Sequence, residues 1–594
     1  MTRARLLMVL CLVGAGGPLW PDAPIMKLDE VRPGMKGVLK TVLEGVKPED
    51  IPVEVVDVIR KVAPGRDAVI VRLHGDRVTR LGIARGMSGS PVYIDGKLVG
   101  ALAFAWRFVR EPIAGLTPIE DMMQVWRTDA PAGKEPAQVV HTWQAGERLP
   151  SHRFIDELLS PKPAFPFISP ANMITLETPI AVKGFSREST TALSERLRAF
   201  DVSVVQAGAA GEPGKVPADV KLEPGGVMAV QVLRGDFEAA ALGTVTEIRG
   251  NRVYGFGHPL FNNGCVELPL ATGMVHVTVP TDDMSFKLGS AIKPVGTVWV
   301  DQSAGIAGEL GVVPEMLKVS LDVKRQDLVG DVRFNFEVVK DPRMMMTFMN
   351  AAVGGALAVS GKPDTQVKMV VHATIVVEGH APVEIEEVQG GPQAPTAALS
   401  AFVIPLGHIL HNPYTRVNIK SVAITVEIIP GDPRAFIRYA ETEKTDYRPG
   451  EEIDVAVTIV PFRKTSIIRH YKLRLPEDVP EGTLSVMVCD SQTDVRMESR
   501  EMPHRFRPED VAGVLDFFRR SRPDTDLVFR LSSSSSGVAV KGQELPELPG
   551  SVVSVLGKQP PTEISQFSKT VVKREPTEFV LVGMQQLQIQ IVKD

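Results

Sequence analysis

The feature that most constrains the fold is a series of short runs rich in Val, Ile and Leu that Gly and Pro interrupt. Between residues 26 and 126 these runs include GVLKTVLEG, PVEVVDVI and DAVIVRLHG. Short strands at close spacing are typical of small β-barrels and sandwiches. Similar runs return at about residue 226 and again beyond residue 431. The sequence therefore predicts a mainly β protein with a few helices.

A chain of 594 residues is too long for one hydrophobic core, so we expect several domains. Composition and turn residues divide the chain into a signal peptide (1–23), a first small β unit (24–130), a linker and mixed segment with one helix (131–225), a second β unit (226–311), a β-rich domain (312–432) and a C-terminal β-sandwich-like region (433–594).

Helices are expected at a few places between these strands. Periodic apolar residues predict them at 117–126, 186–200, around 344–359 and at 508–522. Thr117 would cap the first of these helices. The serine run from Ser532 to Ser536 is low in complexity and is predicted to be a loop.

The N-terminus has the layout of a secretory signal peptide. Arg3 and Arg5 precede an apolar run that small residues and prolines follow, and this run is too short to span a bilayer. We therefore expect a secreted or periplasmic protein, with membrane association only if this segment is retained. Lipidation of Cys11 is not expected, because Leu10 stands where processing prefers a small residue.

Charge and cysteine content narrow the possible partners and the source of stability. The formal net charge is −5, from 66 basic and 71 acidic residues with no long block of one sign, so we expect no nucleic-acid partner. Only Cys265 and Cys489 would remain after removal of the signal peptide. They lie far apart in the sequence, so no disulfide framework is expected and packed cores must stabilise the fold.

The stretch GMSGSPVYIDGKLVGALAFA, residues 86–105, places a serine on a glycine-rich turn before a hairpin. Glycines at Gly86 and Gly89, beside Met87, allow the backbone to bend until its N–H groups face one hollow beside Ser88, which an oxyanion would need. The Asp-Gly pair that follows suits a type I′ turn. The alternative is that the serine lies on a polar turn with no chemistry.

A serine nucleophile also needs a base. His258 follows a strand and lies in the turn-rich segment YGFGHPLFNNG, where a side chain can face a cleft. His74 is its competitor, because it is close to Ser88 in the sequence. Either histidine can equally be a structural residue.

These residues resemble the SpoIVB peptidase family of serine peptidases, whose nucleophile lies in a Gly-Met-Ser-Gly-Ser-Pro turn. The resemblance runs from about Gly34 to Met122, and a second half, GTVTEIRGNRVYGFGHPLF with IKPVGTVWVDQSAGIAGELG, is similar to the segment that carries the family's histidine. The two halves stand in reversed order here. The resemblance implies a trypsin-like pair of β-barrels with Ser88 as nucleophile and His258 as base.

The family's aspartate lies about fifteen residues before its serine, and the ungapped match falls on Leu73. Asp76 serves as the acid if the alignment shifts, and Asp67 is further away. Either aspartate can instead be a loop residue.

Two hypotheses follow for the function. The first is a serine endopeptidase that acts on a protein or peptide substrate through Ser88, His258 and Asp76, with no metal or organic cofactor. The second is an inactive peptidase-like scaffold that binds a partner in the cell envelope.

Overall fold

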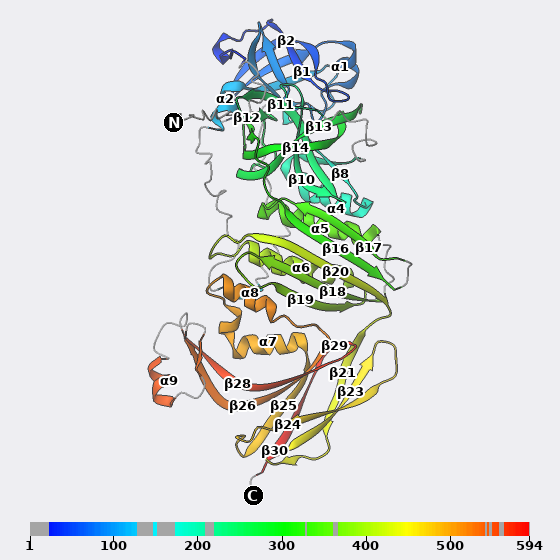
Figure 1. Ribbon diagram of the computed structural model, residues 1–594, viewed down its shortest axis with the longest axis vertical. Coiled ribbons are helices and arrows are strands. Elements are labelled where there is room, and N and C mark those ends of the chain that lie inside the picture. Colours follow the sequence, from blue (N-terminus) through cyan, green and yellow to red (C-terminus); the bar gives the residue numbers. More distant parts are fainter. Residues whose placement is uncertain are drawn as a thin grey trace, which may run out of the picture.

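The computed structural model describes ten stretches of the chain: residues 23–63, 65–126, 147–150, 173–207, 219–326, 330–359, 366–540, 543–545, 549–556 and 564–592. Residues 1–22, which hold the expected signal peptide, and the expected linker near residue 130 lie outside them. The domains follow one another along the long axis of the molecule, with the N-terminal strands at one end and the C-terminal strands at the other (Figure 1).

The N-terminal unit is a closed six-stranded β-barrel. Its strands pair in the order β1-β2-β3-β6-β5-β4, and β4 returns to pair with β1. The strands are Lys36–Thr41 (β1), Glu49–Ala63 (β2), Arg66–Leu73 (β3), Pro91–Ile94 (β4), Lys97–Ala105 (β5) and Ile113–Pro118 (β6). Asp95 and Gly96 both have positive φ, 49° and 73°, so the expected type I′ turn joins β4 to β5. The barrel predicted from the strand spacing is thus confirmed.

A second set of six strands closes in the same way. They pair in the order β10-β13-β14-β15-β12-β11, and β11 returns to β10. They are Val227–Gly235 (β10), Glu238–Arg249 (β11), Arg252–Gly255 (β12), Gly264–Val279 (β13), Phe286–Gln302 (β14) and Gly305–Leu310 (β15). The two barrels lie next to each other at one end of the molecule (Figure 1).

Short elements surround the two barrels. In the first barrel, helix α1 follows β3 and helix α2 follows β6, while β7 pairs with β5. The segment before the second barrel adds β8 and β9 to its sheet beside β11, with α4 between them. These elements are Leu28–Glu30 (η1), Asp76–Leu81 (α1), Ile119–Gln124 (α2), Ile174–Thr175 (β7), Thr178–Lys183 (β8), Arg187–Leu197 (α4), Arg198–Phe200 (η3) and Val202–Gln206 (β9).

The same sheet continues into a layered α/β region. Its strands run in the order β19-β18-β20-β16-β17, and β17 pairs with β10 of the second barrel. The elements are Leu317–Arg325 (β16), Val332–Val338 (β17), Pro342–Val359 (α5), Val367–Val377 (β18), Val383–Gly390 (β19), Ala394–Leu410 (α6) and Ile419–Pro430 (β20). No helix of the described residues has both the length and the apolar character that crossing a membrane requires.

The C-terminal region is a β-sandwich whose two sheets share one core. One sheet has the order β24-β23-β21-β29, and the other has β22-β30-β25-β26-β27 with β28 beside β26. The strands are Arg434–Thr442 (β21), Asp446–Tyr447 (β22), Glu452–Pro461 (β23), Ile467–Arg474 (β24), Gly482–Asp490 (β25), Asp526–Val540 (β26), Gln543–Leu545 (β27), Ile564–Pro576 (β28), Val580–Val582 (β29) and Met584–Ile591 (β30). The helices are Ser491–Glu501 (α7), Pro503–Phe506 (η4), Val511–Arg519 (α8) and Gly550–Leu556 (α9).

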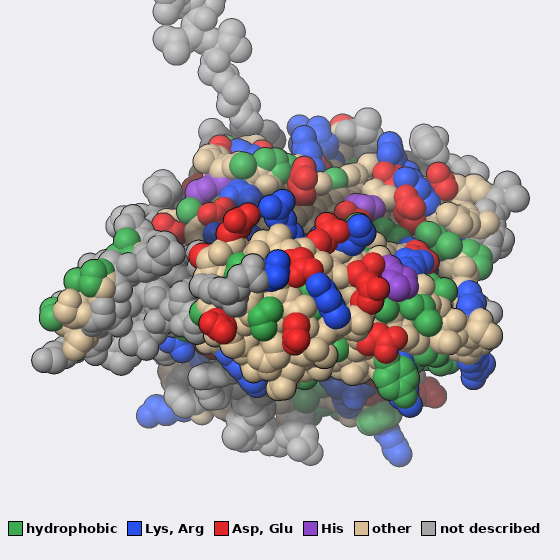
Figure 2. Space-filling view, turned by 90° about the horizontal axis from the view of Figure 1, so that it is seen from below, with side chains coloured by type: hydrophobic (Ala, Val, Ile, Leu, Met, Phe, Trp, Pro, Cys, Tyr) green, Lys and Arg blue, Asp and Glu red, His purple; other side chains and the backbone are tan. Residues whose placement is uncertain are grey.

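Viewed from this C-terminal end, the surface carries Lys and Arg side chains interspersed with Asp and Glu side chains (Figure 2). The described part of this face therefore shows no extended patch of one charge.

Two local predictions are wrong. Ser532 to Ser536 is not a loop but part of β26, where a β-bulge against β28 accommodates the run. Pairing with β28 provides hydrogen bonds for the backbone of this segment, so the segment forms a strand although its residues have little local preference for one. Thr117 does not cap α2, because its hydroxyl donates to Gly257 O of the second barrel at 2.6 Å. A contact between barrels takes the place of the cap.

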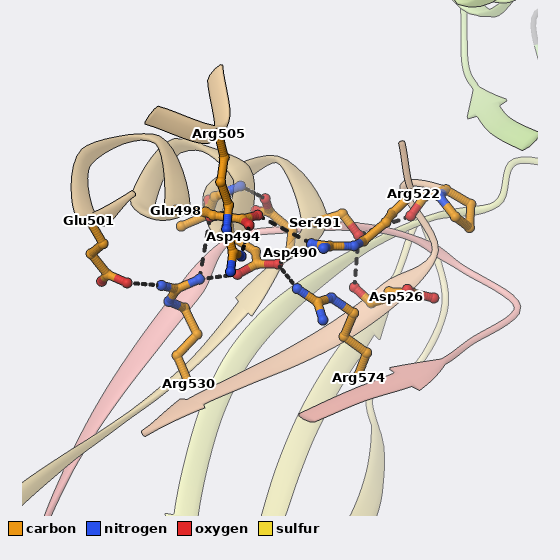
Figure 3. A network of polar contacts seen from close by, with 12 residues as sticks. Asp490, Ser491, Asp494, Glu498, Glu501, Arg505, Arg522, Asp526, Arg530 and Arg574 are labelled. Carbon is orange, nitrogen blue, oxygen red and sulfur yellow. Dashed lines mark hydrogen bonds and ion pairs between the residues drawn. The ribbon is translucent and has the colours of Figure 1, made fainter. Parts of the chain in front are cut away.

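A network of buried ion pairs attaches α7 to the sandwich (Figure 3). Asp494 on α7 is 1 % exposed and binds Arg530, Arg574 at 2.8 Å and Arg522 at 3.2 Å. Asp490 precedes the helix and accepts the N–H of Thr493 at 2.6 Å as its N-cap. Three arginines therefore share one buried carboxylate, although Arg530 also pairs with Glu501 and Arg522 with Glu498 at 3.5 Å.

We expect Asp494→Ala to destabilise α7 and its sheet by about 3–5 kcal/mol, because it removes the buried carboxylate that three arginines share and the one ion-pair partner of Arg574 among the described residues. Hydrogen exchange of peptides that cover α7 and β26 in the full chain measures the effect. The matched control is Asp454→Ala, which breaks an exposed pair with His470 and should cost at most about 1 kcal/mol. Equal protection in the two variants would contradict this account.

Candidate functional site

Ser88 lies on a turn between α1 and β4 whose hydrogen bonds leave two backbone donors free. The N–H groups of Met87, Gly89 and Ser90 bond to Ala84 O, Leu102 O and Met87 O at 2.8–3.0 Å. The N–H groups of Gly86 and Ser88 have no partner among the described residues. The φ angles of Gly86 and Gly89, 92° and 90°, explain why both positions hold glycine. The turn therefore presents two N–H groups next to the serine.

This turn packs directly on the second barrel. Thr244 N–H donates to Ser88 O at 2.8 Å, and the Thr246 hydroxyl donates to Gly89 O at 2.7 Å. A Cβ on Gly89 would lie only 2.4 Å from Phe256 N and 2.1 Å from Thr244 O. The backbone approach thus requires glycine, and it brings Phe256 against the turn.

His258 lies two residues after Phe256, just beyond β12, and is 2 % exposed. Its Nδ1 lies 2.8 Å from Pro259 O. Because a carbonyl can only accept, Nδ1 carries the proton and Nε2 keeps a free lone pair. Burial lowers the pKa of His258 from 6.5 to about 4, and the bond to Pro259 O opposes that shift. The imidazole is therefore neutral at neutral pH and able to accept a proton at Nε2.

Ser88 and His258 each have a buried polar side-chain atom that makes no hydrogen bond within the part of the chain that the structure describes. Ser88 is 0 % exposed, and both its Oγ and His258 Nε2 are buried without a hydrogen-bond partner among the described residues. The two atoms do not bond to each other in this structure. Buried polar atoms are nearly always satisfied, so each exception needs an explanation, and a catalytic role is one such explanation. Both lie where the first barrel meets the second.

The structure places the other candidates elsewhere. Asp76 is the exposed first residue of α1. Asp67 pairs with Arg60 at 2.9 Å, and the exposed His74 lies 3.5 Å from Glu54. None of these three residues has a contact with Ser88 or His258 among the described residues. The orienting partner of His258 is instead a backbone carbonyl, which no residue pattern could indicate.

Comparison with known families identifies one segment of the chain. Residues 21–123 match the family model of SpoIVB peptidase S55. This segment is of the SpoIVB peptidase type. The resemblance read from the sequence is thereby confirmed for the half around Ser88, and the similarity of the half around His258 stays a prediction. The SpoIVB-type segment contains the turn with Ser88 and ends before the second barrel, which carries His258. No curated protein and no solved structure matches the chain.

Asp301 holds the loop that carries His258, and the sequence analysis did not single it out. Its carboxylate is 0 % exposed and accepts the N–H groups of Leu260 and Phe261 at 2.7 Å and of Asn263 at 3.3 Å. Burial raises the pKa of Asp301, and these three bonds oppose the shift. An isolated aspartate at the end of a strand gives no sign of this role in the sequence.

Beneath the SpoIVB-type turn lies a cluster of buried hydroxyls around one lysine. Lys287 of β14 is 2 % exposed, and its Nζ donates to Thr41 Oγ1 at 2.9 Å. Ser90 Oγ lies 2.9 Å from Thr41 Oγ1 and 2.6 Å from Met87 O. Thr244 Oγ1 donates to Gly86 O at 3.2 Å. Burial lowers the pKa of Lys287 to about 7, and the charge of Glu49 opposes that shift.

The residues of this lysine cluster come from both barrels. In the sequence, the only sign of the cluster was that these polar residues lie within apolar strands.

No group of His, Cys, Asp and Glu in the described part of the chain could hold a metal ion. The two cysteines of that part, Cys265 and Cys489, are free.

We expect Asp301→Asn to loosen the His258 loop, because a single amide oxygen cannot replace two carboxylate oxygens that accept three N–H groups. The loss should be about 1–3 kcal/mol of local stability. Hydrogen exchange of peptides covering residues 256–264 measures it. Asp282→Asn serves as control, because Asp282 is exposed. Unchanged protection in the Asp301 variant would show that the loop holds its shape without the carboxylate.

Proposed function

We propose that the chain is an exported serine endopeptidase of SpoIVB type that cleaves protein or peptide substrates. The observation that carries this proposal is the convergence of unpartnered groups at the contact between the barrels. Ser88 Oγ, His258 Nε2 and the N–H groups of Gly86 and Ser88 all lack partners among the described residues. A nucleophile, a base and an oxyanion site are the parts that acyl transfer needs.

The reaction follows from these positions. Ser88 Oγ attacks the scissile carbonyl carbon as its proton passes to His258 Nε2, and the carbonyl oxygen gains the negative charge. The N–H groups of Gly86 and Ser88 stabilise that oxyanion. Imidazolium then protonates the leaving amine, and water hydrolyses the acyl-enzyme by the same steps in reverse. Met87 N–H is not a third donor, because it already bonds to Ala84 O.

Export is part of the proposal and rests on the N-terminal sequence. Arg3 and Arg5 before the apolar run support a secreted or periplasmic location, with membrane association if the segment is not cleaved. No metal or organic cofactor has a step in this mechanism.

One observation favours a second candidate, an inactive peptidase-like scaffold. The Ser88 side chain is 0 % exposed, so a substrate reaches it only if the contact between the barrels opens. A scaffold would not need that opening. The two candidates differ in whether the folded protein reacts at Ser88.

A fluorophosphonate probe distinguishes them. We expect the folded wild type to be labelled, Ser88→Ala to lose all labelling, and His258→Ala to lose it by about 10²-fold or more, because the general base is gone. His74→Ala and Asp76→Asn are the controls for the competing base and acid, and both should be labelled at the wild-type rate. Absence of labelling in the folded wild type would favour the scaffold. Slow labelling of Asp76→Asn would show that Asp76 acts as the acid of the triad after all.

The pH dependence of labelling tests the state of His258. Protonation removes the lone pair at Nε2, so the labelling rate should fall as the pH drops through about 4 and stay flat above that, up to neutral pH. A midpoint near 6.5, the ordinary value for histidine, would show that the imidazole is solvated in the reactive state. Circular dichroism at each pH confirms that the protein stays folded.

A further inference from the structure

Lys287 stands out because its amine is buried without a counter-charge. No carboxylate lies within ion-pair distance of its Nζ among the described residues, and its hydrogen bond goes to Thr41 Oγ1. Removing an ammonium group from water without an opposite charge is expensive. A hydrophobic side chain at this position would avoid that cost. The amine therefore needs an explanation beyond packing.

The direction of the hydrogen bonds around this amine is fixed by which atoms can donate. Met87 O can only accept, so the single proton of Ser90 Oγ points to it at 2.6 Å. Thr41 then supplies the proton between the two hydroxyls, which lie 2.9 Å apart. In its ammonium form Lys287 can only donate, so its Nζ–H bonds to Thr41 Oγ1. A one-way chain thus runs from Lys287 through Thr41 and Ser90 to Met87 O.

This chain ends on the peptide unit that carries the free Ser88 N–H. The carbonyl of Met87 and the N–H of Ser88 belong to the same amide, so a donor on the oxygen increases the positive character of the N–H. Hydrogen bonds in series polarise one another in this way. Ser88 N–H is one of the two donors proposed above for the oxyanion.

The backbone of Lys287 acts in the same way on the second donor. Its N–H donates to Arg85 O at 3.0 Å, and Arg85 O belongs to the amide that carries the free N–H of Gly86. The lysine stem also packs on this turn, since a Cβ on Gly86 would lie 3.2 Å from Lys287 Cβ and Cδ. Lys287 therefore bonds directly to the peptide unit of Gly86 and is linked to that of Ser88 through Thr41 and Ser90.

We propose that Lys287 is a positioning residue of the serine site, which holds and polarises the two oxyanion donors: Gly86 N–H through its own backbone, and Ser88 N–H through Thr41 and Ser90. This inference rests on the proposed peptidase function for its catalytic meaning, but the polarisation itself is a property of the folded protein. Lys287 lies outside the SpoIVB-type segment, so the second barrel completes the oxyanion site of the first.

The test compares Thr41→Val with Thr41→Ser. Valine keeps the shape of threonine and removes the hydroxyl, whereas serine keeps the hydroxyl, so only valine breaks the chain. Thr41→Val combined with Lys287→Met removes both polar partners and avoids leaving an unpaired amine. Thermal unfolding of each variant confirms that it folds.

The first readout does not need activity. In full-length protein labelled with ¹⁵N-serine, the Ser88 amide resonance is assigned by its loss in Ser88→Ala. Its proton shift should move upfield in Thr41→Val and in the double variant, and stay near the wild-type position in Thr41→Ser. An unchanged Ser88 amide in the double variant overturns the proposal, whether or not the protein is a peptidase.

The second readout is the rate of fluorophosphonate labelling, whose phosphoryl oxygen uses the oxyanion site. We expect a loss of about tenfold in Thr41→Val and in the double variant, part of the 10²–10³-fold that removal of a whole donor costs, and near-normal labelling of Thr41→Ser. In a Ser88→Cys background, alkylation by iodoacetamide needs no oxyanion donor and should keep its rate. Equal losses in both reactions would mean general damage and overturn the proposal. A wild type that is not labelled refutes the peptidase function alone, since the amide shift still decides the role of Lys287.

Discussion

The approach of Gly89 to the second barrel is the contact on which the site depends. A Cβ at this position would overlap the backbone at Thr244 and Phe256, so the two barrels meet backbone to backbone. That approach allows Thr244 N–H to bond to Ser88 O and places the segment after β12, with His258, beside the turn. The first barrel carries Ser88 and the two free N–H groups, and the second carries His258. Their arrangement is therefore a property of the contact and not of either barrel.

The sequence predicted the parts that local patterns determine. Alternating apolar runs indicated the barrels, the Asp-Gly pair indicated the turn at Asp95, and periodic residues indicated the helix at Arg187–Leu197. It did not predict α6, whose apolar run contains Pro405, a residue that disfavours a helix interior; packing on β18 and β19 stabilises this helix nevertheless. The serine run in β26 was misread for a similar reason, since pairing with a distant strand outweighs weak local preference.

For the candidate site, too, the sequence predicted the residues that local patterns mark and missed those that depend on distant contacts. Ser88 and His258 were predicted because glycine-rich turns and histidines are visible in a sequence. Lys287, Thr41 and Asp301 were missed, because their importance comes from burial and from partners that are more than 35 residues away along the chain. A lysine in an alternating strand normally faces solvent. The first barrel covers this one, since its side chain lies against the turn at Gly86 and bonds to Thr41 of β1.

The position of His258 also shows why the missing acid does not exclude base chemistry. An acid in a catalytic triad fixes the tautomer and orientation of the imidazole and stabilises the imidazolium. Pro259 O performs the first task here, since it accepts from Nδ1 at 2.8 Å. It carries no full charge, so it stabilises imidazolium less than a carboxylate would. Burial disfavours the imidazolium further, because it lowers the pKa of His258. In the proposed mechanism His258 is therefore a base of fixed tautomer but low pKa, so stabilisation of the transition state depends more on the oxyanion donors, where we propose that Lys287 acts.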